Sequence, residues 1–213
     1  MNASDTAAFF ARLEQVDPEP GSELHYSSPY TLLVAVVLSA QATDVGVNKA
    51  TGPLFEIADT PEKMVALGEE RLREHIRTIG LFRNKAKNVI ALSKALIERH
   101  GGKVPRDREA LQALAGVGRK TANVVLNVAF GEPTIAVDTH IFRVSNRTGL
   151  ARGRTPLAVE EGLGRVVPER FRRHAHHWLI LLGRYICKAR GPECWRCPVE
   201  PYCEFDRKVC EPR

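Results

Sequence analysis

The sequence lacks the features that mark secreted and membrane proteins. The longest largely apolar segment, residues 30–38, is far too short to cross a bilayer as a helix. Residues 1–15 do not show the order of basic, apolar and small-residue parts that a signal peptide has. The cysteines number five, so disulfide pairing would leave one over. These absences predict a cytoplasmic protein, not a secreted one, with reduced thiols.

Strand patterns, internal repeats and low-complexity tracts are also missing. The short segment 134–137 comes nearest to a strand, but a buried connector explains it better. Apolar residues recur instead at helical spacing between proline and glycine breaks, which predicts an all-α fold. We expect a buried central helix over 29–40, a short helix ending at 115, and further helices over 5–16, 81–100, 119–130, 139–147, 155–166 and 174–188. Two more helices should begin after a cap at Thr43 or Asp44 and at residues 60–62, and Gly101-Gly102 should end the helix over 81–100.

The positive charge is unevenly placed along the 213 residues. The net charge is +6, yet residues 1–100 hold 11 basic and 13 acidic residues, whereas residues 101–213 hold 20 and 12. A basic half favours a polyanionic partner, most simply nucleic acid. The indication is weak by itself, because many basic surfaces are only solvated.

Four of the cysteines, Cys187, Cys194, Cys197 and Cys203, fall within 17 residues as C-x6-C-x2-C-x5-C. A metal centre explains this grouping better than disulfides do. Zinc sites usually present two close pairs of ligands, and only one such pair exists here. Iron–sulfur clusters accept other loop lengths, so the spacing favours a cluster and leaves zinc as the alternative. Cys210 breaks the spacing and is expected to be a spectator thiol.

A glycine turn, Gly116-Val117-Gly118, separates the short helix from the helix that we expect to begin at Arg119. Two glycines permit positive φ and let the backbone approach another molecule closely. The start of the second helix then offers free N–H groups and a positive dipole end, which together suit a phosphate. Val117 can pack between the two helices. An ordinary helix corner with a glycine C-cap is the alternative.

Lys120 lies in the first turn of the second helix. The positive end of the helix dipole disfavours a cation there. A partly neutral lysine amine can act as a nucleophile and form a Schiff base. A solvated or phosphate-pairing lysine is the alternative.

Asp138 follows the connector 134–137 and precedes the helix that begins at Thr139. It can simply cap that helix. It can also present a carboxylate that stabilises an oxocarbenium-like sugar or accepts a proton from an attacking amine.

Taken in order, these segments resemble the endonuclease III family of DNA repair glycosylases over nearly the whole chain. The resemblance rests on residues 38–44, 116–122, 137–143 and 176–180 and on the cysteine spacing. It implies a 4Fe-4S cluster on the four cysteines. It also implies two domains divided by a cleft across which bent DNA lies with one nucleotide flipped out. Residues 22–132 would form a six-helix barrel domain containing the helix-hairpin-helix, and residues 1–21 plus 133–213 the iron–sulfur domain.

The same resemblance assigns roles to individual residues. Lys120 would be the catalytic lysine and Asp138 the catalytic aspartate. Gln41 would fill the gap left by the flipped base, and Leu81 would wedge into the base stack. Without the family they would be a solvated loop glutamine and a core leucine. The other residues expected to bind DNA are Gly116, Val117, Gly118, Arg119, Lys188 and Arg190. His140 could line the base pocket or bond to backbone, and is not placed among the site residues.

The implied activity is a bifunctional DNA N-glycosylase and AP lyase that removes oxidised pyrimidines in base excision repair. Its partner would be duplex DNA with damaged bases or abasic sites. We expect a nucleoid-associated monomer with no membrane partner. An adenine-mismatch glycosylase and a non-catalytic DNA-binding hairpin protein are the alternatives. The chain departs from the family pattern at Gln112, Ala115 and Leu182, which leaves pocket shape and substrate range less defined.

Overall fold

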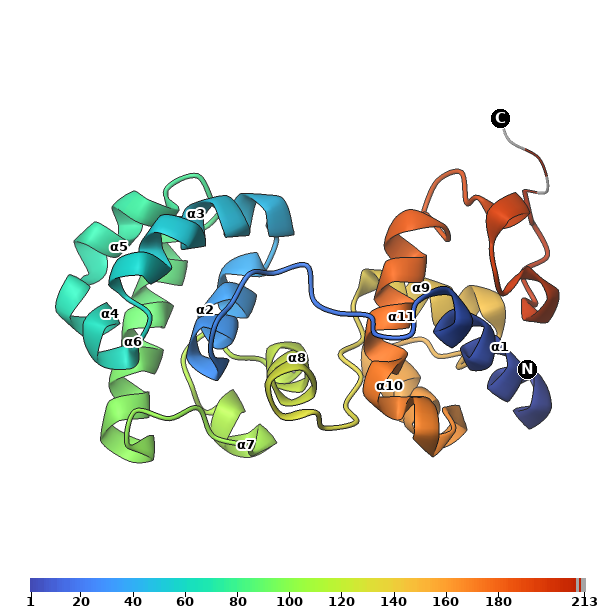
Figure 1. Ribbon diagram of the computed structural model, residues 1–213, viewed down its shortest axis with the longest axis horizontal. Helices are drawn as coiled ribbons and strands as arrows, with labels where there is room; N and C mark the ends of the chain where they lie inside the picture. Colours follow the sequence, from blue (N-terminus) through green and yellow to red (C-terminus); the bar gives the residue numbers. More distant parts are fainter. Residues whose placement is uncertain (210, 212–213) are drawn as a thin grey trace. The chain divides into compact units, whose positions relative to one another are not determined.

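The computed structural model describes residues 1–209 and 211, so Cys210 and its expected spectator role lie outside the described residues. Over this part the fold is all-α, with eleven α-helices, three short 3₁₀-helices and no strand (Figure 1). The predicted fold class is therefore confirmed. Within the same residues no helix combines the length and apolarity needed to cross a membrane.

The chain divides into two compact units. Unit 1 comprises Met1–Gly21 and Glu132–Arg213, and unit 2 comprises Ser22–Gly131. Each unit has its own hydrophobic core.

Unit 2 is built around α2, Pro29–Ser39, whose residues 30–38 are all buried. A helix that is apolar on every side is stable only when neighbours surround it, and α2 packs against α3, α6 and α8. The expectation of a buried central helix is thus confirmed. The remaining helices of unit 2 are α3 (Asp44–Ile57), α4 (Pro61–Leu67), α5 (Glu69–Ile76), α6 (Phe82–His100), α7 (Arg108–Gln112) and α8 (Arg119–Phe130).

Local capping fixes where these helices begin and end. Thr43 caps α3 by accepting a hydrogen bond from the N–H of Gly46 at 3.2 Å. Thr60 caps α4, with Pro61 in the first position, where its missing N–H costs nothing. Gly101, in the left-handed region at φ 58°, ends α6.

Unit 1 combines the N-terminal helix with the C-terminal part of the chain. An aromatic group joins them: Phe10 of α1 stacks on Phe171 with ring centroids 5.7 Å apart, and both rings lie near Trp178. Trp178 also donates its indole N–H to the carbonyl of Asp17 at 2.7 Å. The helices of unit 1 are α1 (Ala3–Val16), α9 (Thr139–Thr148), α10 (Pro156–Val166) and α11 (Arg172–Tyr185), with 3₁₀ turns at Glu169–Phe171, Cys194–Arg196 and Glu200–Tyr202.

Three elements differ from the sequence-based expectation. Helix α7 ends at Gln112 rather than at 115, because tight turns follow in which Leu114 and Val117 each donate to the carbonyl three residues earlier. Helix α11 ends at Tyr185 rather than at 188, because the N–H of Cys187 turns back to the carbonyl of Leu182. Helix α5 was not expected at all.

Candidate functional site

The glycine hairpin brings backbone, not side chains, to the surface. Gly116 has φ +77°, and a Cβ there would lie 2.9 Å from Nδ2 of Asn88 on α6, so only glycine fits. Gly118 lies in open space and has an ordinary extended conformation. Val117 is buried in the core of unit 2, as expected. The hairpin is therefore anchored by Val117 and exposed at Gly118.

Helix α8 begins without a side-chain cap. Its first helical hydrogen bond runs from the N–H of Ala122 to the carbonyl of Gly118, so the N–H groups of residues 119–121 precede the helical ladder. Lys120 and Arg119 are both exposed in this first turn. The N–H groups that precede the helical ladder, the helix dipole and two cationic side chains together form an anion-attracting surface.

Asp138 caps α9, as one interpretation of the sequence predicted. Its Oδ1 accepts hydrogen bonds from the N–H groups of His140 and Ile141, at 2.9 and 2.8 Å. Its Oδ2 lies 2.9 Å from Nδ1 of His140, and its side chain is only 10% exposed. This capping role is compatible with a catalytic role, because both carboxylate oxygens of Asp138 are held in fixed positions.

Gln41 and Leu81 share an unusual backbone. They are the two non-glycine residues with positive φ in the described part of the chain, at 55° and 60°. Both are exposed, and Leu81 keeps 59% of its surface. A core role for Leu81 is therefore excluded. Strained, exposed residues of this kind concentrate at functional sites.

The four clustered cysteines line one cavity, together with Arg147, Phe205 and neighbouring side chains. All four are free thiols. Burial raises the pKa of Cys197 to about 11, and the nearby thiols of Cys203, Cys187 and Cys194 add to the rise. Across residues 1–209 and 211, however, no three His, Cys, Asp or Glu side chains are placed to hold one metal ion.

Two arginines of α9 hold the first cysteine loop. Arg143 donates to the carbonyls of Cys187 at 2.9 Å and Gly183 at 2.8 Å. Arg147 donates to the carbonyl of Lys188 at 2.7 Å and approaches Sγ of Cys187 at 3.6 Å. Arginine suits such sites because its guanidinium carries several donors in one plane.

The known proteins that resemble this chain fall into one family. Residues 34–169 match the HhH-GPD superfamily base excision DNA repair protein family. Endonuclease III of Haemophilus influenzae is 57% identical over 209 residues, which is 98% of this chain and 99% of that protein. The chain belongs to the endonuclease III family.

Other relatives extend the likeness to structure. Endonuclease III of Escherichia coli strain K12 is 56% identical to this family member over 98% of the chain and 99% of the relative. A solved structure described as a trapped endonuclease III–DNA covalent intermediate superposes with a TM-score of 0.89, at 46% identity over 96% of both chains. A non-covalent endonuclease III–DNA complex gives the same TM-score at 45% identity and the same coverage.

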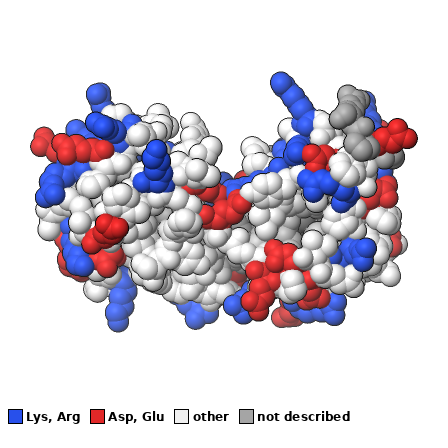
Figure 2. Space-filling model, turned by 45° about the horizontal axis from the view of Figure 1, so that its top comes forward, with Lys and Arg blue, Asp and Glu red and all other residues white. Residues whose placement is uncertain are grey.

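In the loop 188–190 of this endonuclease III family member, Lys188 is less free to bind DNA than its sequence implied. Nζ of Lys188 lies 2.5 Å from Oε1 of Glu193, to which Arg196 is also paired. Arg190 is exposed. On the face shown in Figure 2, basic and acidic side chains are interspersed over each unit rather than gathered into one basic patch. The positive charge of the second half of the chain is thus partly balanced locally.

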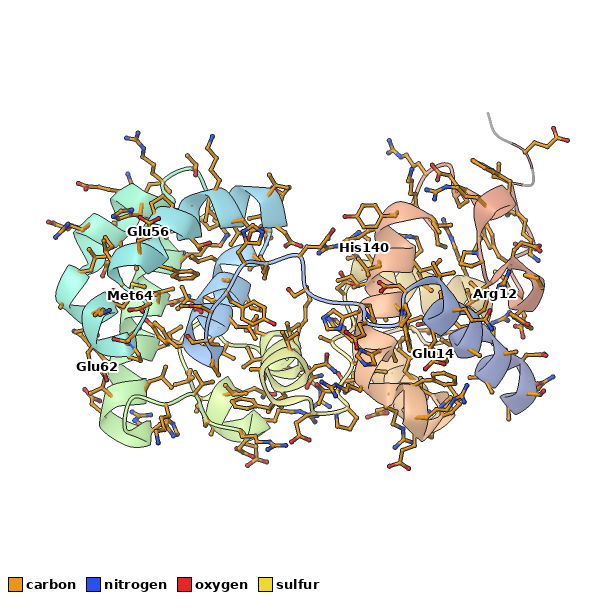
Figure 3. All side chains as sticks on the ribbon, viewed as in Figure 1. Arg12, Glu14, Glu56, Glu62, Met64 and His140 are labelled. Carbon is orange, nitrogen blue, oxygen red and sulfur yellow. The ribbon has the colours of Figure 1, made fainter. Side chains whose placement is uncertain are left out.

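Sequence reasoning missed the role of two side chains in this family member. His140, labelled in Figure 3, pairs with Asp138, although its place two residues after the cap could have suggested the contact. Arg147 reaches the cysteine loop from one turn beyond Arg143. Nothing in the local sequence signals that contact, because the loop lies about forty residues further along the chain.

Proposed function

We propose that this protein is a DNA N-glycosylase with AP lyase activity that removes oxidised pyrimidines from duplex DNA in base excision repair. The observation that carries the proposal is the exposed residue Lys120 at the start of α8, which has no side-chain cap and follows the glycine hairpin directly. The relative trapped as a covalent DNA intermediate supports it, because such trapping requires a nucleophile on the protein.

Lys120 supplies that nucleophile. The lone pair of its neutral Nζ attacks C1′ of the damaged nucleotide, the bond from C1′ to the base breaks, and the base leaves with the electron pair and takes up a proton. Loss of a proton from nitrogen and opening of the sugar ring give a Schiff base. The C2′ proton is then acidic, and its loss expels the 3′ phosphate by β-elimination. Hydrolysis of the imine returns the free lysine.

Asp138 supplies negative charge. Positive charge develops on the sugar as the base departs, and a fixed carboxylate stabilises it without having to reorganise. The same carboxylate can accept a proton from the attacking amine. Oδ1 is held by two backbone N–H groups, so the carboxylate already has a defined orientation before substrate binds.

The remaining candidate residues hold and open the duplex. The hairpin backbone and the start of α8 contact one phosphate, through Gly116, Val117, Gly118 and Arg119. Such a contact carries no base specificity. Leu81 enters the base stack and Gln41 occupies the space of the flipped nucleotide. Arg190 contacts phosphate, and Lys188 does so if it exchanges its bond to Glu193. Genomic DNA as substrate agrees with a cytoplasmic, nucleoid-associated location.

Borohydride trapping tests the proposal. A duplex with one thymine glycol is incubated with enzyme and sodium borohydride, which reduces the Schiff base to a stable amine. The wild-type chain should give a protein–DNA adduct on a denaturing gel, and Lys120→Ala should give none. Lys94→Ala is the matched control, because it removes an exposed lysine of α6 that has no proposed role in binding or catalysis, and it should give the wild-type adduct. An undiminished adduct with Lys120→Ala would refute the assignment.

A duplex with adenine opposite 8-oxoguanine tests the adenine-mismatch alternative.

The four cysteines are proposed to hold a 4Fe-4S cluster. The thiols line one cavity, yet no three of the described potential ligands suit one ion. A cluster is larger than one ion, so its thiolates need not converge so closely. When bound, the cluster would tie together the loop from Cys187 to Cys203. Iron and sulfide analysis with visible absorbance tests this, and stoichiometric zinc without iron would contradict it.

A further inference from the structure

The imidazole of His140 contacts the carboxylate proposed to act in catalysis. Nδ1 of His140 lies 2.9 Å from Oδ2 of Asp138, while Oδ1 of Asp138 accepts two backbone N–H groups at the start of α9. The Asp138 side chain is 10% exposed and that of His140 33%. Both carboxylate oxygens are therefore engaged, by different kinds of donor.

Capping alone does not require this second contact. An N-cap aspartate satisfies helix N–H groups with one oxygen, and the other oxygen usually faces solvent. Here Nδ1 of His140 also contacts the second oxygen of Asp138, and this contact fixes the plane of the carboxylate. A neutral ring with its proton on Nδ1, or a protonated ring, donates to Oδ2, and such bonds favour the ionised carboxylate.

Helix α11 holds His140 in place from the other side. A Cβ on Gly183 would lie 2.7 Å from Cβ of His140 and 3.2 Å from its carbonyl carbon, so only glycine permits this approach. Arg143 of α9 donates to the carbonyl of Gly183 at 2.8 Å and so keeps the two helices together. Figure 3 shows His140 next to α11. Its backbone consequently has little freedom to carry the ring away from Asp138.

We propose that His140 is a positioning residue for base excision: its ring holds the Asp138 carboxylate charged and in one orientation before substrate binds. The inference rests on the proposed function, because it needs Asp138 to stabilise the sugar when the base departs. A preset carboxylate lowers the barrier to that step, whereas one that must first turn or ionise does not. The effect should therefore fall on the rate of base release and not on DNA affinity.

Two substitutions of His140 distinguish a role in positioning Asp138 from a purely structural role. His140→Ala removes the donor. His140→Asn retains one, because the side-chain amide nitrogen of asparagine occupies nearly the place of Nδ1. Single-turnover excision is measured on a thymine-glycol duplex, and borohydride trapping on a preformed abasic duplex, where no base remains to leave. Thermal unfolding of both variants reports whether they fold.

We expect His140→Ala to slow base excision at saturating DNA by about 10- to 100-fold, the range for loss of a hydrogen bond to a charged group. The affinity for DNA should stay within about twofold, and trapping on abasic DNA should fall much less than excision. His140→Asn should recover most of the excision rate. Excision by His140→Ala at the wild-type rate would overturn the inference. Equal loss in both variants, or a loss confined to DNA affinity, would also overturn it.

Different outcomes would contradict the proposed function itself. If the wild-type chain forms no adduct on abasic DNA, or if Asp138→Asn excises as fast as wild type, the proposed roles of Lys120 or Asp138 are wrong, and the role of His140 is overturned with them. If wild type traps and Asp138→Asn is slow while His140→Ala is fast, only the inference about His140 is overturned.

Discussion

The carbonyl oxygen of Gln41 lies 3.8 Å from the position that a Cβ on Gly80 would take, so the loop after α2 and the loop before α6 lie side by side. Each loop carries a side chain on left-handed backbone, Gln41 in one and Leu81 in the other. For a residue other than glycine this conformation costs about 1–2 kcal/mol. Stability explains neither the strain nor the exposure of Leu81, whereas the proposed wedge into a duplex would explain both.

Replacing Leu81 should separate stability from DNA binding. Leu81→Gly relieves the strained φ, so the melting temperature should stay the same or rise, although the greater freedom of glycine in the unfolded chain offsets part of the gain. Binding to a duplex with a central abasic site should weaken, because the wedge is gone. Leu81→Ala serves as the control, since it keeps most of the strain and also lacks the wedge. Thermal unfolding and fluorescence anisotropy measure the two effects. A glycine variant that melts well below the alanine variant would show that Leu81 is not strained.

The two hairpin glycines should respond differently to alanine. Gly116→Ala places a Cβ on left-handed backbone against Asn88 and should destabilise the fold by about 1–3 kcal/mol. Gly118→Ala meets nothing within 4 Å and has ordinary backbone angles, so stability should hardly change. Its added methyl group stands where the hairpin backbone is proposed to approach phosphate, so DNA affinity should fall. Urea unfolding and salt-dependent DNA binding distinguish the two effects. Wild-type DNA affinity of Gly118→Ala would contradict a close backbone contact.

The presence of most helices could be predicted from the sequence, because capping residues and the spacing of apolar residues are local signals. Thr43, Thr60 and Gly101 all mark the helix ends that the sequence predicts. Helix α5 was missed because only Leu72 and Ile76 of its residues are buried, and a single glycine separates it from α4.

The details that position the site depend on distant contacts. The end of α11 is set where Cys187 turns back to Leu182 and meets Arg143, a residue 44 positions away in the sequence. The positive φ of Gln41 and Leu81 has no local sequence signature, since both residues normally avoid it. The resemblance to the endonuclease III family could therefore suggest a role for these two residues. Local sequence rules could not predict their strained backbone conformation.

Arg147 should control how firmly the cysteine loop holds the proposed cluster. Arg147 donates to the carbonyls of Lys188 and Ala189 at 2.7 and 3.0 Å, approaches Sγ of Cys187 at 3.6 Å and covers the ring of Phe205. Arg147→Lys keeps the charge and loses the planar donor set. With iron bound, a chelator should bleach the visible absorbance of this variant roughly 10-fold faster than that of wild type. Arg165→Ala, which removes an exposed cation of α10, is the control. Equal bleaching rates for Arg147→Lys and wild type would show that the loop holds without these bonds.

His177 should make the protein sensitive to mild acid. Burial lowers the pKa of His177 to about 4, and the nearby His174 lowers it further while Asp17 opposes the shift. The ordinary value is about 6.5, so below that pH the unfolded chain binds a proton that the folded chain does not. Stability from this residue is complete above pH 6.5 and is lost as the pH falls toward 4. Between pH 7.5 and 4.5 the loss should be about 2.5 kcal/mol.

Urea unfolding of wild type and His177→Leu at several pH values tests this expectation. The leucine cannot take up a proton, so the difference in unfolding free energy between the two proteins should change by about 2.5 kcal/mol across the range, in favour of the variant at low pH. His25→Gln, which removes an exposed histidine of unit 2, is the control and should follow wild type. The comparison uses differences between variants, so acid effects common to all the carboxylates cancel. Parallel curves for wild type and His177→Leu would mean that the His177 ring becomes protonated inside the folded protein without cost, which its burial against His176 makes physically unfavourable.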